Sequence, residues 1–278
     1  MVGKTFARSH QGSKHIKEKK ICQDYSQKHK TKGYALVAVS DGHGGDDYFR
    51  SHLGSEFACK EALSAINKFM SILAEKDMLS KNTDALFRQL SISIISKWRD
   101  RVAKHHRSKP FEEAELSSLS EKSRERYLAN LDDSFIKAYG ATLIVVVQSA
   151  DFWFGLHIGD GKCVAAYPDG TFNEPIPWDE KCFLNRTTSL CDEDAINNFR
   201  YCFHTDNLPI ALFIGSDGVD DSFATQEQLY GFYEKVLEMY RQYSFSRANR
   251  QLDKYLPTLS QKGSGDDISL AFIMGNLN

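Results

Sequence analysis

Aspartates recur in this chain where apolar segments begin or end. One apolar run leads directly into Asp41, a second leads through Ser216 into Asp217, and near the C-terminus Asp266 instead precedes an apolar run. The three runs cover residues 35–40, 211–215 and 268–274. Short apolar runs bounded by glycines are typical of buried strands. If these strands pair into sheets, their carboxylates could gather at one edge and bind a hard divalent cation, which prefers oxygen ligands.

Further acids extend this pattern. Asp160 lies in a Gly-Asp-Gly turn after another apolar run, Asp24 is flanked by apolar residues, and Asp221 follows Asp217 by four residues. Each of these aspartates alone is readily explained as a turn residue, because aspartate tolerates tight backbone geometry. Together they would repel one another unless cations intervened. Two Mg²⁺ or Mn²⁺ ions about 3.5–4 Å apart can activate a water for phosphoryl transfer, and the carbonyl of Gly42 could be a further ligand.

Strands and long helices are the elements that must position these acids. Apolar residues at three-to-four spacing predict helices over 46–73, 82–98, 225–243 and 247–256. Apolar runs predict strands over 35–40, 138–147, 152–158, 163–167, 210–214 and 268–274. Short turns between the strands from 138 to 167 indicate an antiparallel meander.

Two stretches fit neither pattern. Residues 99–135 change from basic to acidic and are rich in serine, which we interpret as a solvated helix extension or an inserted loop, with partner docking as an unsupported alternative. Residues 171–209 hold three prolines and no clear period, and we expect an irregular excursion beside the site.

Composition sets limits on function. The 278 residues are 41% hydrophobic and show no repeat or linker, so one domain over 1–278 is expected. A formal net charge of −2 gives no basic field for a nucleic-acid partner. With no signal-like or membrane-spanning apolar stretch, and six cysteines without a C-x-x-C pair, a cytoplasmic protein with reduced thiols and no membrane contact is expected.

Five motifs occur in an order that resembles the metal-dependent serine/threonine protein phosphatases of the PP2C or PPM family, in their bacterial type with a single catalytic domain. The motifs are DGHGG (41–45), GAT (140–142), GDG (159–161), SDGVDD (216–221) and GDDIS (265–269). The resemblance implies an α+β fold, a four-layer α-β-β-α sandwich of two antiparallel sheets flanked by helices. It also implies two Mn²⁺ or Mg²⁺ ions between the sheets, with a third, weaker site.

The resemblance also implies roles for individual residues. Asp41 would bridge both metals and serve catalysis, and His43 matches a position proposed as general acid for the leaving alkoxide. A histidine that only hydrogen-bonds metal-shell waters is an equal alternative for His43. The other implied ligands are Asp24, Gly42, Asp217 and Asp266, with Asp160 and Asp221 near the third ion.

The first motif departs from the family pattern. The family commonly has an arginine three residues after a glycine and four before the first acid, where it grips the substrate phosphate. Here His15 stands three residues after Gly12, and Lys19 stands four before Gln23, which replaces the usual glutamate. An insertion therefore separates the two spacings. His15 and Lys19 are both candidates to bind phosphate, and neither offers the bidentate fork of arginine.

The resemblance implies a phosphatase that hydrolyses phosphoserine and phosphothreonine in protein partners, through a metal-bridging hydroxide and without a phosphoenzyme. A standalone monomer is expected. An inactive phosphoprotein-binding module is the alternative: the missing arginine and Gln23 favour it weakly, and retention of Asp41, Asp217 and Asp266 argues against it. A hydrolase of small phosphate esters would share the same centre, and the sequence does not separate it from a protein phosphatase.

Overall fold

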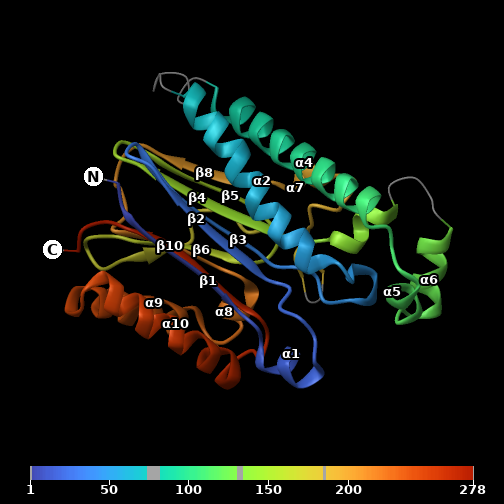
Figure 1. The fold of residues 1–278 in the computed structure, drawn as a ribbon. Coiled ribbons are helices and arrows are strands. Elements are labelled where there is room, and N and C mark those ends of the chain that lie inside the picture. Colours follow the sequence, from blue (N-terminus) through green and yellow to red (C-terminus); the bar gives the residue numbers. More distant parts are fainter. Residues whose placement is uncertain (1, 74–81, 130–133, 184–185, 278) are drawn as a thin grey trace.

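The chain is built as two antiparallel sheets packed face to face between two pairs of helices (Figure 1). The computed structural model describes residues 2–73, 82–129, 134–183 and 186–277. In these residues one sheet has the strand order β1-β10-β9-β6-β7 and the other β2-β3-β4-β5-β8. The strands are β1 Lys4–His10, β2 Tyr25–Lys30, β3 Tyr34–Ser40, β4 Leu143–Ser149, β5 Trp153–Ile158, β6 Lys162–Ala166, β7 Phe172–Asn173, β8 Arg200–His204, β9 Ala211–Gly215 and β10 Ile268–Met274.

Helices cover the outer face of each sheet. The helices α2 and α4 lie over the sheet that contains β3, and α9 and α10 lie over the sheet that contains β10 (Figure 1). The helical elements are α1 Ser13–Glu18, η1 Asp46–Tyr48, α2 Ser51–Ile72, α4 Thr83–Ser108, α5 Glu113–Ser117, α6 Glu121–Leu128, η2 Ser134–Tyr139, α7 Ala195–Asn198, α8 Asp217–Asp220, α9 Gln226–Gln242 and α10 Phe245–Lys262. The four-layer α-β-β-α prediction is confirmed.

The core forms three apolar layers, one between the sheets and one beneath each pair of helices. Strand β3 shows why its sequence is apolar at every position. Leu36 and Ala38 pack under α2 and α4, whereas Val37 and Val39 pack between the sheets. Successive side chains of a strand point to opposite faces, and here both faces are buried.

The predicted meander is wrong at its third strand. Strands β4 and β5 pair as expected, but β6 joins the other sheet, beside β9 and β7. The chain changes sheets at Gly159, which has a φ of +117°, and at Gly161, where a Cβ would lie 2.5 Å from the carbonyl oxygen of Gly215. Only glycine fits both positions. This crossing places Asp160 at the end of both sheets.

The second helix is longer than predicted. Helix α4 continues to Ser108, ten residues beyond the predicted end, because Val102 still packs in the core. In its described residues, 99–129 and 134–135, the stretch interpreted as an extension or insert is a helical extension followed by α5, α6 and the start of η2, and residues 130–133 lie outside the described part.

All six cysteines are free thiols, as predicted. Within the described residues, no helix combines the length and apolarity that crossing a bilayer requires.

Candidate metal and phosphate site

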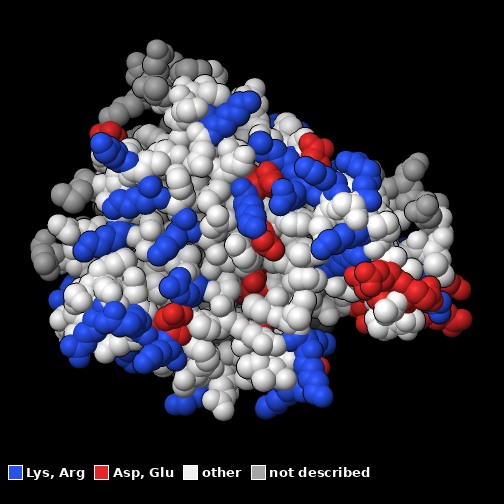
Figure 2. Space-filling model, in the orientation of Figure 1, with Lys and Arg blue, Asp and Glu red and all other residues white. Residues whose placement is uncertain are grey.

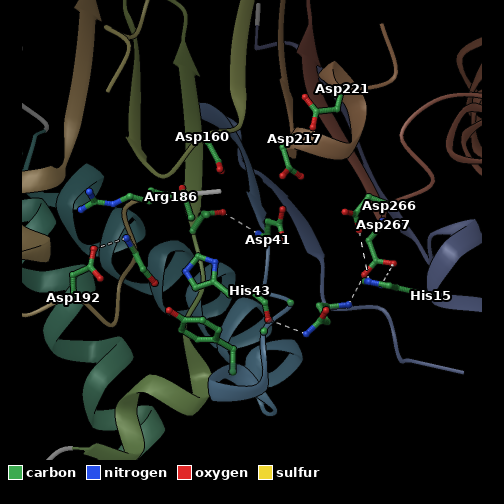
Figure 3. Close-up of a pocket in the computed structure, with 18 residues that line it drawn as sticks. His15, Asp41, His43, Asp160, Arg186, Asp192, Asp217, Asp221, Asp266 and Asp267 are labelled. Carbon is green, nitrogen blue, oxygen red and sulfur yellow. Dashed lines mark hydrogen bonds and ion pairs between the residues drawn. The ribbon is translucent and has the colours of Figure 1, made fainter. Parts of the chain in front are cut away.

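A pocket of about 700 Å³ opens at one end of the two sheets, where the loops after β3, β5 and β9 and before β10 meet (Figure 3). Most of the residues singled out from the sequence line it, although they come from distant parts of the chain. These are His15, Asp41, Gly42, His43, Asp160, Asp217, Asp221 and Asp266. The sheet pairing thus brings together the acids that the sequence placed at separate strand ends.

Asp41 is held at the end of β3 by the Gly-Ala-Thr motif. The backbone N–H of Asp41 donates to Oγ1 of Thr142 (3.0 Å), and the N–H of Thr142 donates to the carbonyl of Asp41 (2.8 Å). The next residue, Gly42, donates its N–H to the carbonyl of Gln23 (3.1 Å), and a Cβ at this position would lie only 2.6 Å from that oxygen. The backbone around Asp41 is therefore fixed from both sides.

We call the carboxylates of Asp41, Asp160 and Asp217 the floor of the pocket. Asp24 does not line the pocket but lies close to Asp41 and Asp217. It is 7% exposed, and its Oδ2 accepts a hydrogen bond from Oγ of Ser216 (2.7 Å). Burial raises the pKa of Asp24 to about 8, although the bond from Ser216 acts in the opposite direction. Asp24 is therefore placed to act on the acids of the floor more directly than on a substrate.

The acids of the floor disfavour one another's charge. Burial, and then the charges of Asp24 and Asp217, raise the pKa of Asp41 well above its ordinary value. Burial also raises the pKa of Asp217 to about 6 and raises that of Asp160. Carboxylates that are crowded in this way are stabilised by cations. An all-oxygen donor set fits Mn²⁺ or Mg²⁺.

His15 projects from α1 toward the acids that precede β10 (Figure 3). Its Nδ1 lies 2.9 Å from Oδ1 of Asp267, at ion-pair distance but without an aligned hydrogen bond. Asp267 is 3% exposed, and its two oxygens accept the backbone N–H groups of Gly12 and Gln23, each at 2.6 Å. Among the described residues, His15, Asp266 and Asp267 form the only group of His, Cys, Asp or Glu side chains with three potential metal-ligand atoms within 4.8 Å of one another. Because each oxygen of Asp267 accepts a backbone N–H, Asp267 holds the backbone at Gly12 and Gln23 close to His15.

The two candidates for phosphate binding are separated in the structure. Lys19 ends α1 with a φ of 58°, is exposed and does not line the pocket. His15, one turn earlier, does line it. The position of His15 favours it as the phosphate contact.

His43 forms the wall opposite Asp266. Its ring packs edge to face on Tyr48, with ring centroids 4.8 Å apart. The backbone N–H of His43 donates to the carbonyl of Gly140 (3.1 Å). A Cβ on Gly140 would lie 2.8 Å from the His43 ring, which explains the glycine. Burial lowers the pKa of His43 to about 4, so its imidazole is neutral near pH 7.

Tyr48 and four residues of the stretch 171–209 line the pocket but were not singled out from the sequence as site residues. The four are Arg186, Thr187, Ser189 and Asp192, from the stretch expected to form an excursion beside the site. Figure 3 shows Arg186 and Asp192 on the side opposite His15. In the described part of the chain, Arg186 is the only Lys or Arg among the lining residues. The irregular sequence predicted that the stretch lies near the site but gave no signal for individual residues.

The segment after α4 braces the loop that carries His43. Arg50 is buried and forms a bidentate pair with Glu115 (2.7 and 2.6 Å), and it also donates to the Tyr139 hydroxyl (2.8 Å). Phe49 packs on Phe111, with ring centroids 4.9 Å apart. The segment therefore has a structural role that its charged sequence did not indicate.

The fold and the pocket together define a class of protein: a two-sheet sandwich with carboxylates gathered at one end, as expected for metal-dependent phosphoryl transfer. A sequence model described as protein phosphatase 2C matches residues 11–257. The chain therefore belongs to the protein phosphatase 2C family of protein phosphatases. A search of curated proteins gave no match.

Solved structures share the fold at low sequence identity. The serine/threonine phosphatase Stp1 from Staphylococcus aureus aligns with a TM-score of 0.61 and 12% identity, over 99% of this chain and 96% of that one. PppA, described as a regulatory component of T6SS in Pseudomonas aeruginosa, gives 0.60 and 16%, over 99% of both chains. The catalytic domain of PstP, solved in complex with two manganese ions, gives 0.54 and 15%, over 98% and 97%.

Proposed function

We propose that the protein hydrolyses phosphoserine and phosphothreonine in proteins, with Mn²⁺ or Mg²⁺ as cofactor. The observation that carries this proposal is the convergence of Asp41 and Asp217, whose pKa values are raised by burial, in a pocket that His15 also lines. Membership of the protein phosphatase 2C family supports the reaction class.

Asp41, Asp217, Asp266 and the carbonyl of Gly42 would hold two divalent ions, with Asp160 and Asp221 available to a third. When bound, the ions would offset the crowding of the carboxylates and lower the pKa of water for attack on phosphorus. Asp24, close to the floor, would tune the charge of the ligands. In PstP, the related domain was solved with two manganese ions, which supports the same stoichiometry here.

The chain's own residues would orient the substrate. His15, whose Nδ1 faces Asp267, would donate a hydrogen bond to a phosphate oxygen through its other ring nitrogen. The low pKa of His43 favours the second role considered from the sequence, in which a neutral imidazole hydrogen-bonds in the pocket rather than acting as general acid. Thr142 would keep Asp41 in place through its two hydrogen bonds.

Phosphorylated proteins are the proposed partners, and one catalytic domain acting as a cytoplasmic monomer is the proposed form. The six free thiols support a reducing compartment.

The test is hydrolysis of p-nitrophenyl phosphate and of a phosphothreonine peptide, with and without Mn²⁺. We expect Mn²⁺-dependent turnover that falls by about 10²-fold or more in Asp41→Ala and Asp217→Asn. Asp100→Asn, on the exposed side of α4, is the matched control and should keep full activity. Wild-type turnover no higher than that of Asp41→Ala would contradict the proposal. Peptide binding without turnover would instead indicate the inactive, phosphoprotein-binding alternative.

A further inference from the structure

Helix α1 sits at the edge of the pocket and turns its outer side to solvent. No residue of α1 is buried. Its base is nevertheless fixed, because the N–H of Ser13 donates to Oγ of Ser260 (3.0 Å) and the N–H of Lys14 donates to the carbonyl of Gly265 (2.9 Å). The helix is thus a firmly attached but uncovered element beside the site.

The outer side of α1 and the residues after it form what we call the α1 surface, defined as Ile16, Lys17, Lys19, Lys20 and Ile21. The two isoleucines are 59% and 53% exposed. Glu18 is the only acid between Lys14 and Ile21, and it pairs with Lys20 at 2.7 Å. In the described part of the chain, Lys17 and Lys19 have no ion-pair partner. Figure 2 shows basic side chains gathered on the α1 projection at the bottom of the view.

The α1 surface is continuous with the pocket. His15, which lines the pocket, is the immediate neighbour of Ile16 on the same helix. Lys17 lies about 3 Å from His15 along the helix axis, and the backbone N–H of Lys20 donates to the carbonyl of His15 (2.9 Å). A polypeptide whose phosphoresidue enters the pocket therefore passes over this surface with only a few flanking residues.

We propose that the α1 surface binds an acidic segment next to the phosphoresidue of the protein substrate and so selects phosphosites with acidic and apolar neighbours. This proposal rests on the proposed phosphatase function. The lysines supply charge complementary to flanking Asp or Glu, and the isoleucines cover an apolar side chain of the same segment. Several aspartates and a single arginine line the described part of the pocket, so an acidic segment beside it gains from the basic contact that the α1 surface offers.

The first test compares two phosphothreonine peptides that differ only in flanking Glu or Gln, each with one flanking Leu. We expect the wild type to prefer the Glu peptide by roughly tenfold in kcat/KM at low salt, with the preference falling as salt rises. Lys17→Glu/Lys20→Glu should abolish the preference, whereas Lys68→Glu/Lys104→Glu, on exposed parts of α2 and α4, should keep it. Hydrolysis of p-nitrophenyl phosphate should stay within about twofold in both variants, because that small substrate has no flanking residues to contact the α1 surface.

An apolar test uses the same design. Ile16→Ser/Ile21→Ser should lower kcat/KM for the Leu-containing peptide about threefold and leave a Leu-to-Ser peptide unchanged. Ile92→Ser, at an isoleucine of α4 that is 42% exposed, is the matched control.

Several outcomes would overturn the proposal. They are equal rates for the Glu and Gln peptides in wild type, an equal loss on p-nitrophenyl phosphate in the Lys17/Lys20 variant, or Lys17/Lys20-dependent binding to phosphatidylserine vesicles without any change toward peptides. If p-nitrophenyl phosphate were not hydrolysed at all, the phosphatase function itself would fail. Fluorescence anisotropy with the labelled Glu peptide and metal-free protein would then still decide whether α1 binds it.

Discussion

The floor and the rim of the pocket follow opposite rules. The floor consists of carboxylates at strand ends, such as Asp41 and Asp217, whose pKa values are raised by burial. The rim at α1 carries lysines, two exposed isoleucines and His15, whose partner Asp267 is fully engaged by backbone amides. A bound cation would stabilise the crowded carboxylates of the floor, whereas the rim presents exposed lysines to solvent. This division lets one pocket bind metals at its base and an anion at its mouth.

The strongest way to sharpen this comparison is to change His15. His15→Ala should raise KM for p-nitrophenyl phosphate about tenfold with little change in kcat, because a ground-state phosphate contact is lost. His15→Arg should restore a low KM, since its planar fork binds phosphate in bidentate fashion. Lys19→Ala, outside the pocket, is the control in steady-state kinetics. An unchanged KM in His15→Ala would remove His15 from phosphate binding.

A smaller effect is expected in the pH dependence of the melting temperature, Tm, of the metal-free protein. The pKa of buried Asp24, about 8, lies above its ordinary value of 3.8, so the metal-free native state holds this proton more tightly than the unfolded chain does. The contribution of protonated Asp24 to the free energy of unfolding is therefore fully present below about pH 4 and is lost as the pH rises through about 8. With EDTA, Tm should therefore fall by about 3 °C between pH 7 and 8.5, above the range of histidine titration.

Asp24→Asn should weaken this pH dependence, and added Mn²⁺ should raise Tm most at pH 8.5. Differential scanning fluorimetry measures both effects. A Tm that is flat or rising with pH in EDTA, and identical in Asp24→Asn, would show that burial does not raise the pKa of Asp24 in the metal-free protein.

The smallest effect concerns Gln23, at the boundary between floor and rim. Its Nε2 donates to the carbonyl of His43 (2.9 Å) and to Oγ of Ser51 (2.7 Å). Gln23→Glu would install the acid common in the family but could not donate to either oxygen. We expect Tm to fall by about 2 °C without a gain in kcat. A higher kcat in Gln23→Glu would show that the hydrogen bonds of the Gln23 amide are not needed for activity.

Much of the floor could be predicted from the sequence. The strands that end or begin at Asp41, Asp217 and Asp266 lie where their apolar runs indicated, because a strand buried on both faces leaves a continuous signal. The sheet to which β6 belongs could not be predicted. Short turns favour hairpins, and only the tight approach of Gly161 to Gly215 shows that the chain changes sheets there.

The rim was much less accessible to sequence reasoning. The link between Asp267 and His15 joins residues about 250 positions apart, and no local period reports it. The pairing of Arg50 with Glu115 is equally remote, so a charged stretch read as solvated turned out to brace the His43 loop. Such ion pairs join side chains that are distant in sequence and could not be predicted from it. The apolar pattern of a strand or helix is local, so it can be recognised in the sequence.

The central claim is that the floor carboxylates bind divalent cations. Isothermal titration of Mn²⁺ into EDTA-treated, dialysed protein tests it most directly, with Asp217→Asn as the probe and Asp100→Asn as the control. We predict about two Mn²⁺ per chain in wild type and in the control, and the loss of at least one in Asp217→Asn. Absence of Mn²⁺ binding to the wild type, or the same binding in Asp217→Asn, would contradict the account.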